Sequence, residues 1–366
     1  MSYTLFDLFI DSPCLFISPS GLRLSISSKQ SDILGDKCNN FHIKSILDSS
    51  SFEYIFLHID SFSICFIDPC LFKNSHKLIL ILGDTHHGPK PLTYLCNWII
   101  SSNVKRIINY SCPHHDELIS LFTGIECVYF PAIFGVKFWL KPHSSPSSKI
   151  VHIGNISSHH IRRTLILANL ANSSVNVDIL QVHGYQMNLR LNQSIVSINC
   201  SLNCDISHRV SESLAAGTLV VTDRLTKYQK FLQHLADENI ISLYSFNKPS
   251  QLIDVLLMLE DLHTSPSGRN ELFARKNKSQ REFRNILRKF SFYEAAAKYI
   301  TLKAVELPFI LRPFTSNFDR PLTWNDLEFY EACQEKHRLN ELNDVFKLNL
   351  SYNQKILLQR LCGFIF

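Results

Sequence analysis

The most informative stretch of the chain is His208-Arg209-Val210-Ser211-Glu212-Ser213-Leu214-Ala215-Ala216-Gly217-Thr218-Leu219-Val220-Val221-Thr222-Asp223. It predicts a helix that starts near His208, carries Glu212 in its opening turns and ends with Gly217 at the C-cap. A short, continuous apolar run follows, which is typical of a strand buried on both faces of a parallel sheet. A helix that passes directly into such a strand indicates an α/β fold.

The same alternation extends to both sides of this stretch. We predict strands at 52–59, 77–82, 104–110, 126–130, 149–153, 175–181, 193–199 and 218–223. Between them, helices are predicted at 91–102, 116–122 and 161–171, and further helices at 249–262 and 270–300. Residues 141–148 are polar and contain prolines, and they indicate a linker between domains. The chain should therefore form two Rossmann-like lobes, at 1–145 and 149–300, followed by a helical tail at 301–366.

Composition narrows the class of protein. The chain has 366 residues, of which 45% are hydrophobic and 19% charged, so disorder is excluded. The net charge of +5 is scattered, which argues against nucleic acid as a partner. The 11 cysteines lack a Cys-x-x-Cys pair and lie mostly in apolar, strand-like runs such as 63–67, so we expect buried thiols. With neither a signal peptide nor an apolar run long enough to cross a bilayer, we expect a cytoplasmic protein and leave peripheral membrane contact open.

The stretch from Arg209 to Gly217 resembles the nucleotide-binding motif of GT-B glycosyltransferases, and most closely that of the spore-maturation-type branch. The resemblance implies two lobes facing a central cleft, with the helical tail packing back on the first lobe. It also implies that the Glu212 carboxylate accepts hydrogen bonds from ribose hydroxyls and that Arg209 lies near the diphosphate. Where many related enzymes have a second glutamate, this chain has Cys204. Two further positions complete this part of the predicted donor site: Asp205, as a substitute for that glutamate, and His208.

A second candidate lies at the start of the second lobe. Gly154 and Asn155 follow a predicted strand, and Arg162 and Arg163 open the next helix. This arrangement resembles the loop whose backbone N–H groups and basic side chains face the donor phosphates in the same enzymes. An ordinary loop between a strand and a helix would have the same sequence pattern. Because consecutive helical residues point about 100° apart, we expect only one of the two arginines to point inward.

In the first lobe, Asp84, His86 and His87 follow the apolar strand 77–82 and should lie at the carboxyl edge of the sheet. We assign these three side chains as catalytic candidates near the acceptor hydroxyl or the transferred sugar, since histidine can bind a proton near neutral pH. The run 114–116, His-His-Asp, follows the next strand and would lie on the same edge. Both groups are equally compatible with polar loop residues or helix caps.

Several other classes fail on their motifs. A metallophosphoesterase needs further metal ligands that the chain lacks, and a Rossmann dehydrogenase needs a Gly-x-Gly-x-x-Gly turn that is absent. No Asp-x-Asp motif occurs, so we assign no metal ligands and no cofactor, and expect a metal-independent hexosyltransferase. Its partners would be a nucleotide-sugar donor and a glycan, lipid or protein acceptor. A sugar-nucleotide epimerase and a non-catalytic nucleotide-sugar-binding protein remain as alternatives.

Overall fold

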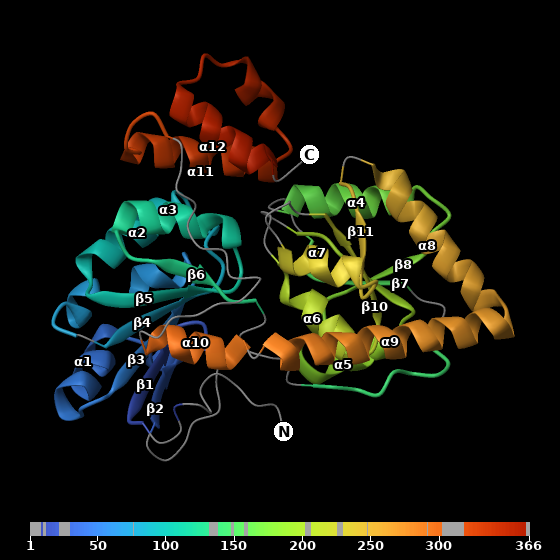
Figure 1. Ribbon diagram of the computed structural model, residues 1–366, viewed down its shortest axis with the longest axis horizontal. Helices are drawn as coiled ribbons and strands as arrows, with labels where there is room; N and C mark the ends of the chain where they lie inside the picture. Colours follow the sequence, from blue (N-terminus) through green and yellow to red (C-terminus); the bar gives the residue numbers. More distant parts are fainter. Residues whose placement is uncertain are drawn as a thin grey trace. The chain divides into compact units, whose positions relative to one another are not determined.

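The computed structural model describes most of the chain (Figure 1). The described residues are 9, 12–21, 30–75, 77–131, 138–147, 150–156, 160–201, 206–224, 230–246, 248–290, 292–301 and 318–363. They belong to two compact units, each with its own parallel sheet. The first unit comprises Met1–Gly135, Ser291–Gln334 and Leu348–Leu361, and the second comprises Val136–Phe290, Glu335–Lys347 and Cys362–Phe366.

The first unit is built on a six-stranded parallel sheet with the order β2-β1-β3-β4-β5-β6. Its strands are β1 (Cys14–Ser18), β2 (Gln30–Leu34), β3 (Tyr54–Ile59), β4 (Leu78–Leu82), β5 (Val104–Asn109) and β6 (Cys127–Tyr129). Strands β1 and β4 are buried along their whole length. Such strands are expected where helices cover both faces of a parallel sheet, and the predicted α/β class is therefore confirmed.

Helices from both ends of the chain belong to this unit. They are α1 (Asn40–Ser49), α2 (Pro91–Ser101), α3 (Asp116–Thr123), α10 (Phe292–Ile300), α11 (Trp324–Arg338), which continues into the residues of the second unit, and α12 (Tyr352–Gly363). Helix α10, orange in Figure 1, contributes Ala295, Ala296, Tyr299 and Ile300 to the core formed by Phe16, Phe56 and Ile81. The helical character predicted for 270–300 is confirmed by α9 (Pro266–Phe290) and α10. The predicted place of α10 in the second lobe was wrong, because its residues bury their apolar face on the first sheet.

The tail helix α11 caps the N-terminus of α2. Lys90, which precedes α2, has φ 49° and provides no side-chain cap. Instead, the Glu331 carboxylate accepts hydrogen bonds from the backbone N–H of Leu92 at 2.6 Å and of Thr93 at 3.0 Å, and from the Thr93 hydroxyl at 2.7 Å. A residue more than 200 positions away thus satisfies N–H groups that the first turn of a helix leaves unpaired.

The second unit contains a five-stranded parallel sheet with the order β11-β10-β9-β7-β8. The strands are β7 (Ile150–Ile153), β8 (Val177–Leu180), β9 (Val196–Asn199), β10 (Leu219–Asp223) and β11 (Ser242–Tyr244). The helices are α4 (Ile161–Ala171), α5 (Gly184–Asn192), α6 (His208–Ala215), α7 (Lys230–Asp237), α8 (Pro249–Thr264) and α9 (Pro266–Phe290). Along β7, Ile150 packs into one core, whereas Val151 and Ile153 pack into another with Met187 and Ala216. The alternation follows from the opposite orientation of successive side chains in a strand.

The described part of the expected linker is attached to the second unit. Helix α6 has Ala216 as its C-cap, and Gly217 follows with φ 75°, one position beyond the predicted C-cap. A Cβ atom on Gly217 would lie 2.7 Å from the Pro142 ring. The side chain of Asn192 donates to the carbonyl of Lys141 at 2.9 Å. Residues 141 and 142 therefore pack as part of this unit rather than as a free connection.

The cysteines follow the prediction in part. Of the nine free cysteines in the described residues, seven are buried and two, Cys65 and Cys70, are exposed. Cys65 lies in a 3-10 turn, Ser63–Phe66, where a strand-like run was expected. Among the described helices, none combines the length and the apolar character that crossing a bilayer requires.

Candidate functional site

Each sheet has a position where the chain changes its direction of travel across the sheet. In the second sheet this position is β7, which lies between β8 and β9. The connections that leave the neighbouring strands β7 and β9 run in opposite directions across the sheet, to β8 and to β10. The α/β folds bind ligands at such points. Gly154 and Asn155 follow β7, and Cys200 and Ser201 follow β9. The predicted loop at Gly154 therefore lies at the switch point of the second sheet.

Arg163 connects the two strand ends. Its guanidinium group donates to the Asn155 carbonyl at 2.7 Å and to the Cys200 carbonyl at 3.3 Å, while its buried Nε atom has no partner in the described residues. A Cβ atom on Gly154 would lie 3.3 Å from the Arg163 guanidinium and 3.2 Å from His152 Nε2. Glycine at this position allows the backbone to pass close to both side chains.

Arg162 is a buried cation. Its side chain is 9% exposed, and its guanidinium carbon lies 3.7 Å from the centre of the Phe246 ring. No hydrogen bond or ion pair joins Arg162 to another residue in the described part of the chain. The expectation that only one of Arg162 and Arg163 points inward was wrong. At the first turn of α4, Arg163 bonds the carbonyl groups that follow two strands, and the side chain of Arg162 is buried against Phe246.

His152 adds a neutral imidazole that the sequence analysis did not assign. It is 2% exposed on β7, and its Nδ1 atom lies 3.0 Å from the Ile198 carbonyl, so this nitrogen carries the proton. Burial lowers the pKa of His152 to about 4, with further lowering by the charges of Arg163 and Arg209. Its Nε2 atom is buried and has no partner among the described residues. The alternating strand pattern placed His152 in the sheet but gave no sign of the arginines around it.

Helix α6 carries the two residues of the predicted donor motif. Ser207 caps the helix by accepting from the Arg209 N–H. Arg209 Nη1 and Glu212 Oε2 form an ion pair at 2.5 Å, and the two side chains are 25% and 31% exposed. Arg209 also contacts the Met187 sulfur on α5. The structure thus brings the predicted cation and acid together as an ion pair.

The other predicted donor residues are less informative. His208 begins α6 and is exposed. Asp205 and the neighbouring Cys204 lie outside the described residues. Gly154, Asn155, Arg162 and Arg163 come from the β7–α4 segment, and Arg209 lies close enough to affect His152 on β7.

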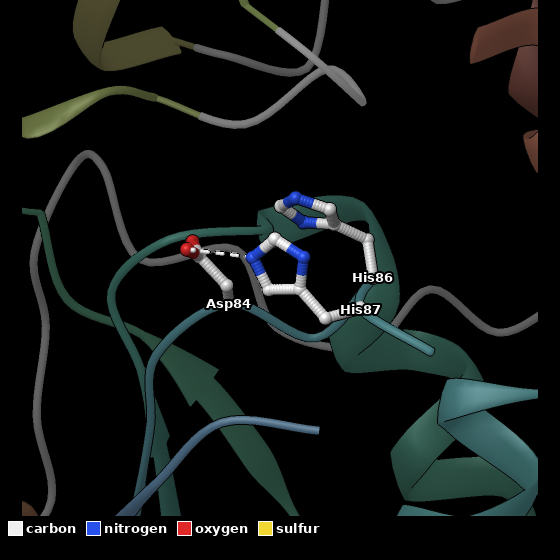
Figure 2. A group of neighbouring side chains, drawn as sticks. All are labelled: Asp84, His86 and His87. Atoms are coloured by element: carbon white, nitrogen blue, oxygen red, sulfur yellow. Dashed lines mark hydrogen bonds and ion pairs between the residues drawn. The ribbon is translucent and has the colours of Figure 1, made fainter. Parts of the chain in front are cut away.

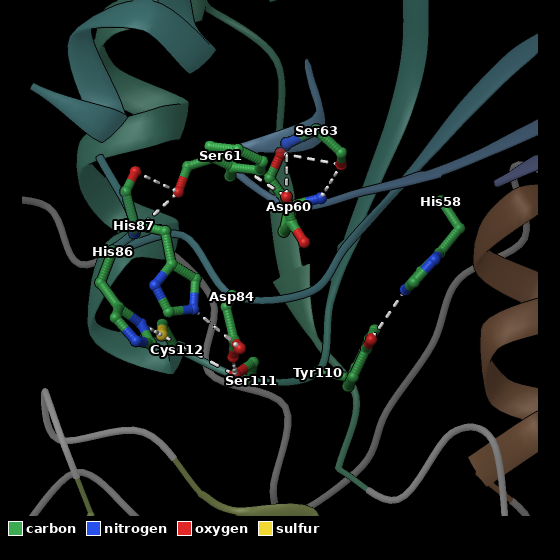
Figure 3. Close-up of polar contacts among 11 residues, drawn as sticks. His58, Asp60, Ser61, Ser63, Asp84, His86, His87, Tyr110, Ser111 and Cys112 are labelled. Atoms are coloured by element: carbon green, nitrogen blue, oxygen red, sulfur yellow. Dashed lines mark hydrogen bonds and ion pairs between the residues drawn. The ribbon is translucent and has the colours of Figure 1, made fainter. Parts of the chain in front are cut away.

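The first unit holds a polar cluster where β3, β4 and β5 end. His87 Nε2 lies 3.3 Å from Asp84 Oδ2, and the Ser111 hydroxyl donates to Asp84 Oδ1 at 2.9 Å (Figures 2 and 3). His86 Nδ1 lies 3.6 Å from Cys112 Sγ. Burial acts to raise the pKa of Asp84, but the hydrogen bonds from His87 and Ser111 and the charges of both histidines outweigh it and hold this pKa well below its usual range. The three predicted catalytic candidates thus form one cluster.

A second group of hydrogen-bonded polar residues lies at this edge, and the sequence did not predict it. His58 on β3 is buried and lies 2.8 Å from the Tyr110 hydroxyl and 3.2 Å from the Ser18 hydroxyl (Figure 3). Burial, with a smaller effect of the Asp84 charge, raises the pKa of Tyr110. Gly83 lies against this pair, since a Cβ atom there would be 3.2 Å from the Tyr110 hydroxyl. The order of strands brings these residues together, and no local motif marks them.

The run 114–116 has a structural role where its side chains are described. His115 is fully buried, contacts the Thr85 hydroxyl and lies 2.8 Å from the Gln334 amide of α11. Asp116 accepts from the Asn109 amide at 2.6 Å, and burial raises its pKa well above the usual range. These contacts connect the β4–α2 and β5–α3 loops to the tail helix.

Comparisons with known proteins give only distant similarities. No family model matches the chain, and no curated protein matches it significantly. Among solved structures, the chain is similar to a sucrose-phosphate synthase from Thermosynechococcus elongatus, with 9% identity, 72% of this chain and 76% of that chain covered, and a TM-score of 0.49. It is also similar to a UDP-forming α,α-trehalose-phosphate synthase from Burkholderia xenovorans, with 9% identity, 81% and 100% covered, and a TM-score of 0.49. The glycotransferase of kitacinnamycin matches with 10% identity, 68% and 78% covered, and a TM-score of 0.30. Similarities of this size do not assign the chain to a family.

Proposed function

We propose that the chain is a GT-B glycosyltransferase of the spore-maturation-like branch, which transfers a hexose from a nucleotide-diphosphate sugar to a glycan, lipid or protein acceptor. The observation that carries this proposal is Arg162, a buried cation without a counter-ion in the described residues. Leaving a buried charge unpaired is costly, so such a residue favours an anionic ligand. Arg163 and Arg209 lie close to the same strand end, which gives this ligand more than one positive charge to meet.

A nucleotide diphosphate suits the chemistry of this region. The guanidinium groups of Arg162, Arg163 and Arg209 can donate to phosphate oxygens, and the Nε atom of Arg163 has a hydrogen bond left to make. Glu212 offers an acceptor-only carboxylate to a pair of ribose hydroxyls. The Arg209–Glu212 ion pair is partly exposed, so opening it for a ligand costs little.

In the proposed reaction, the bond between the anomeric carbon and the diphosphate oxygen breaks, and a bond to the acceptor oxygen forms. The electron pair leaves with the diphosphate, whose developing charge the arginines and the N-terminal amides of α6 stabilise without a metal ion. The acceptor hydroxyl gives up its proton, for which Asp84, His86 and His87 in the first unit are the candidate bases. His87 Nε2 lies 3.3 Å from Asp84 Oδ2, so the carboxylate can orient this imidazole.

One observation supports a non-catalytic alternative. Arg209 and Glu212 form an i, i+3 ion pair, which also occurs in helices that bind no ligand. A protein that binds a nucleotide sugar without turning it over would need no more than the same second unit. An epimerase would use the same pocket and act on the sugar nucleotide alone.

The test is calorimetric titration of the full chain with UDP, GDP, ADP and their glucose conjugates, followed by an assay of donor hydrolysis. We expect one diphosphate to bind and its sugar conjugate to be hydrolysed slowly, with release of the same diphosphate. Epimerised sugar nucleotide, formed without an acceptor, would instead identify an epimerase. Tight binding with neither reaction would support the binding protein. If no nucleotide binds, the proposal fails in all three forms.

A further inference from the structure

The loop between β4 and α2 places a carboxylate and two imidazoles close together (Figure 2). One ligand atom from each of Asp84, His86 and His87 lies within 4.8 Å of the other two. The two imidazole rings are 4.3 Å apart between their centres. We infer that these three side chains form a binding site for a single divalent transition-metal ion such as Zn²⁺, because two imidazoles and a carboxylate are ligands that such ions prefer.

The hydrogen bond between His87 and Asp84 is long, and its length is close to the spacing of two ligand atoms on one ion. His87 Nε2 and Asp84 Oδ2 are 3.3 Å apart. A charge-assisted hydrogen bond between such groups is usually about 2.7–2.9 Å long. Two ligand atoms bound to one tetrahedral zinc ion, each at about 2.0–2.1 Å, lie roughly 3.4 Å apart. The spacing of this pair is therefore compatible with an ion bound to both, and both side chains are nearly half exposed.

The surrounding residues hold the loop in the required shape. The Ser61 N–H donates to the Asp84 carbonyl at 2.9 Å, and the Ser61 hydroxyl donates to the His87 carbonyl at 2.9 Å (Figure 3). The Ser111 hydroxyl donates a hydrogen bond to Asp84 Oδ1, and the other carboxylate oxygen, Oδ2, faces His87. Contacts of this kind orient ligands in metal sites.

Three protein ligands leave a coordination position open, as in catalytic zinc sites. A hydroxyl or water bound there loses its proton more easily. The link to an acceptor hydroxyl rests on the proposed function, whereas metal binding itself does not. With an ion bound, the three side chains would act as ligands rather than as bases, and the ion would ease loss of the acceptor proton. The phosphoesterase shell that the sequence excludes needs two ions, and this site needs only one. Cys112 lies beside His86 but outside the group of three, so it has no assigned role.

Equilibrium dialysis of the full chain against Zn²⁺ tests the site. The exposed thiols Cys65 and Cys70 are first replaced by serine, because they can bind zinc on their own. We expect one ion per chain. His86→Ala and His87→Ala should each weaken binding by more than about 100-fold, since losing a supporting residue alone costs 10- to 100-fold. The control is His42→Ala, which removes an exposed histidine of α1 in the same unit and should leave binding unchanged.

A second measurement keeps the test valid if an alanine variant misfolds. Asp84→Asn preserves the shape of the side chain and should weaken zinc binding at least tenfold with an unchanged circular dichroism spectrum. The visible spectrum of bound Co²⁺ should also change in this variant. The inference is overturned if folded His86→Ala and His87→Ala chains bind zinc with undiminished affinity. It is also overturned if the chain with both histidines binds no ion. Nucleotide binding by the second unit is measured separately with EDTA present, so a failure here is distinguishable from a failure of the proposed function.

Discussion

Replacing Glu212 by alanine separates a ligand-binding carboxylate from a surface ion pair. The Arg209–Glu212 pair spans one turn of α6, and its side chains are 25% and 31% exposed. Pairs of this kind contribute at most about 0.5 kcal/mol to stability. Glu212→Ala should therefore leave the free energy of unfolding almost unchanged, with a fall of about 0.5 kcal/mol or less.

The effect on nucleotide binding should be larger. A hydrogen bond to a charged group is worth about 1.5–3 kcal/mol. Freeing Arg209 to meet the diphosphate returns about 0.5 kcal/mol, so the net loss is about 1–2.5 kcal/mol for one ribose contact. This loss corresponds to a 5- to 70-fold rise in Kd, as an order-of-magnitude expectation.

Calorimetry with two ligands gives the sharpest version of this experiment. The loss should appear with UDP and vanish with its 2′,3′-dideoxy analogue, which lacks both hydroxyls. Glu271→Ala is the matched control, because Glu271 forms an ion pair with Arg275, also at 2.5 Å, on helix α9 of the same unit. Equal losses for both ligands, or no loss for either, would refute the assignment of Glu212 to the ribose.

Three further predictions concern the second unit. Arg162→Met should weaken binding of a nucleoside diphosphate at least about tenfold in calorimetry. The melting temperature without ligand should stay equal or rise, because the change removes a buried charge that lacks a counter-ion in the described residues. Unchanged affinity would contradict the anion site. His152 has its pKa lowered to about 4 in the folded state, so the unfolded chain takes up the proton first as the pH falls. Urea titrations should show stability falling between about pH 6.5 and 4 by up to about 3 kcal/mol, and His152→Gln should flatten this slope. Gly217→Ala should lower the free energy of unfolding by more than about 2 kcal/mol, because φ is 75° and the new Cβ atom would contact Pro142. Gly184→Ala, where φ is 59° and the space is open, should lower it by only about 1–2 kcal/mol. Equal losses would refute the close approach of Gly217 to Pro142.

Local patterns predicted the elements around the donor motif well. The helix from His208 and the turn at Gly217 are present, because a capping serine, a helical apolar period and a glycine at the helix end all act over a few residues. The strand 78–82 and the helix 161–171 were predicted for similar reasons. Strands β1, β2 and β11 and helices α1, α5 and α7 received no prediction.

The same difference between local and long-range contacts applies to the candidate sites. Asp84, His86 and His87 come from one loop, so their proximity could be read from the chain. The contacts of Ser61 with this loop and of Glu331 with α2 could not be predicted, because they join segments far apart in the chain. Our prediction also placed α10 in the wrong lobe, because periodicity shows that a helix has an apolar face but not which sheet will bury it.

By itself, the sequence determined the α/β class, the helix and strand around Glu212, and the residue types available for phosphate and sugar recognition, because these depend on neighbours a few positions apart. Only the tertiary structure decided that Arg162 is buried without a counter-ion and that His152 is held neutral between arginines. Burial and charge at those positions depend on the order of strands in the sheet, which brings β7, β9 and α6 to one edge.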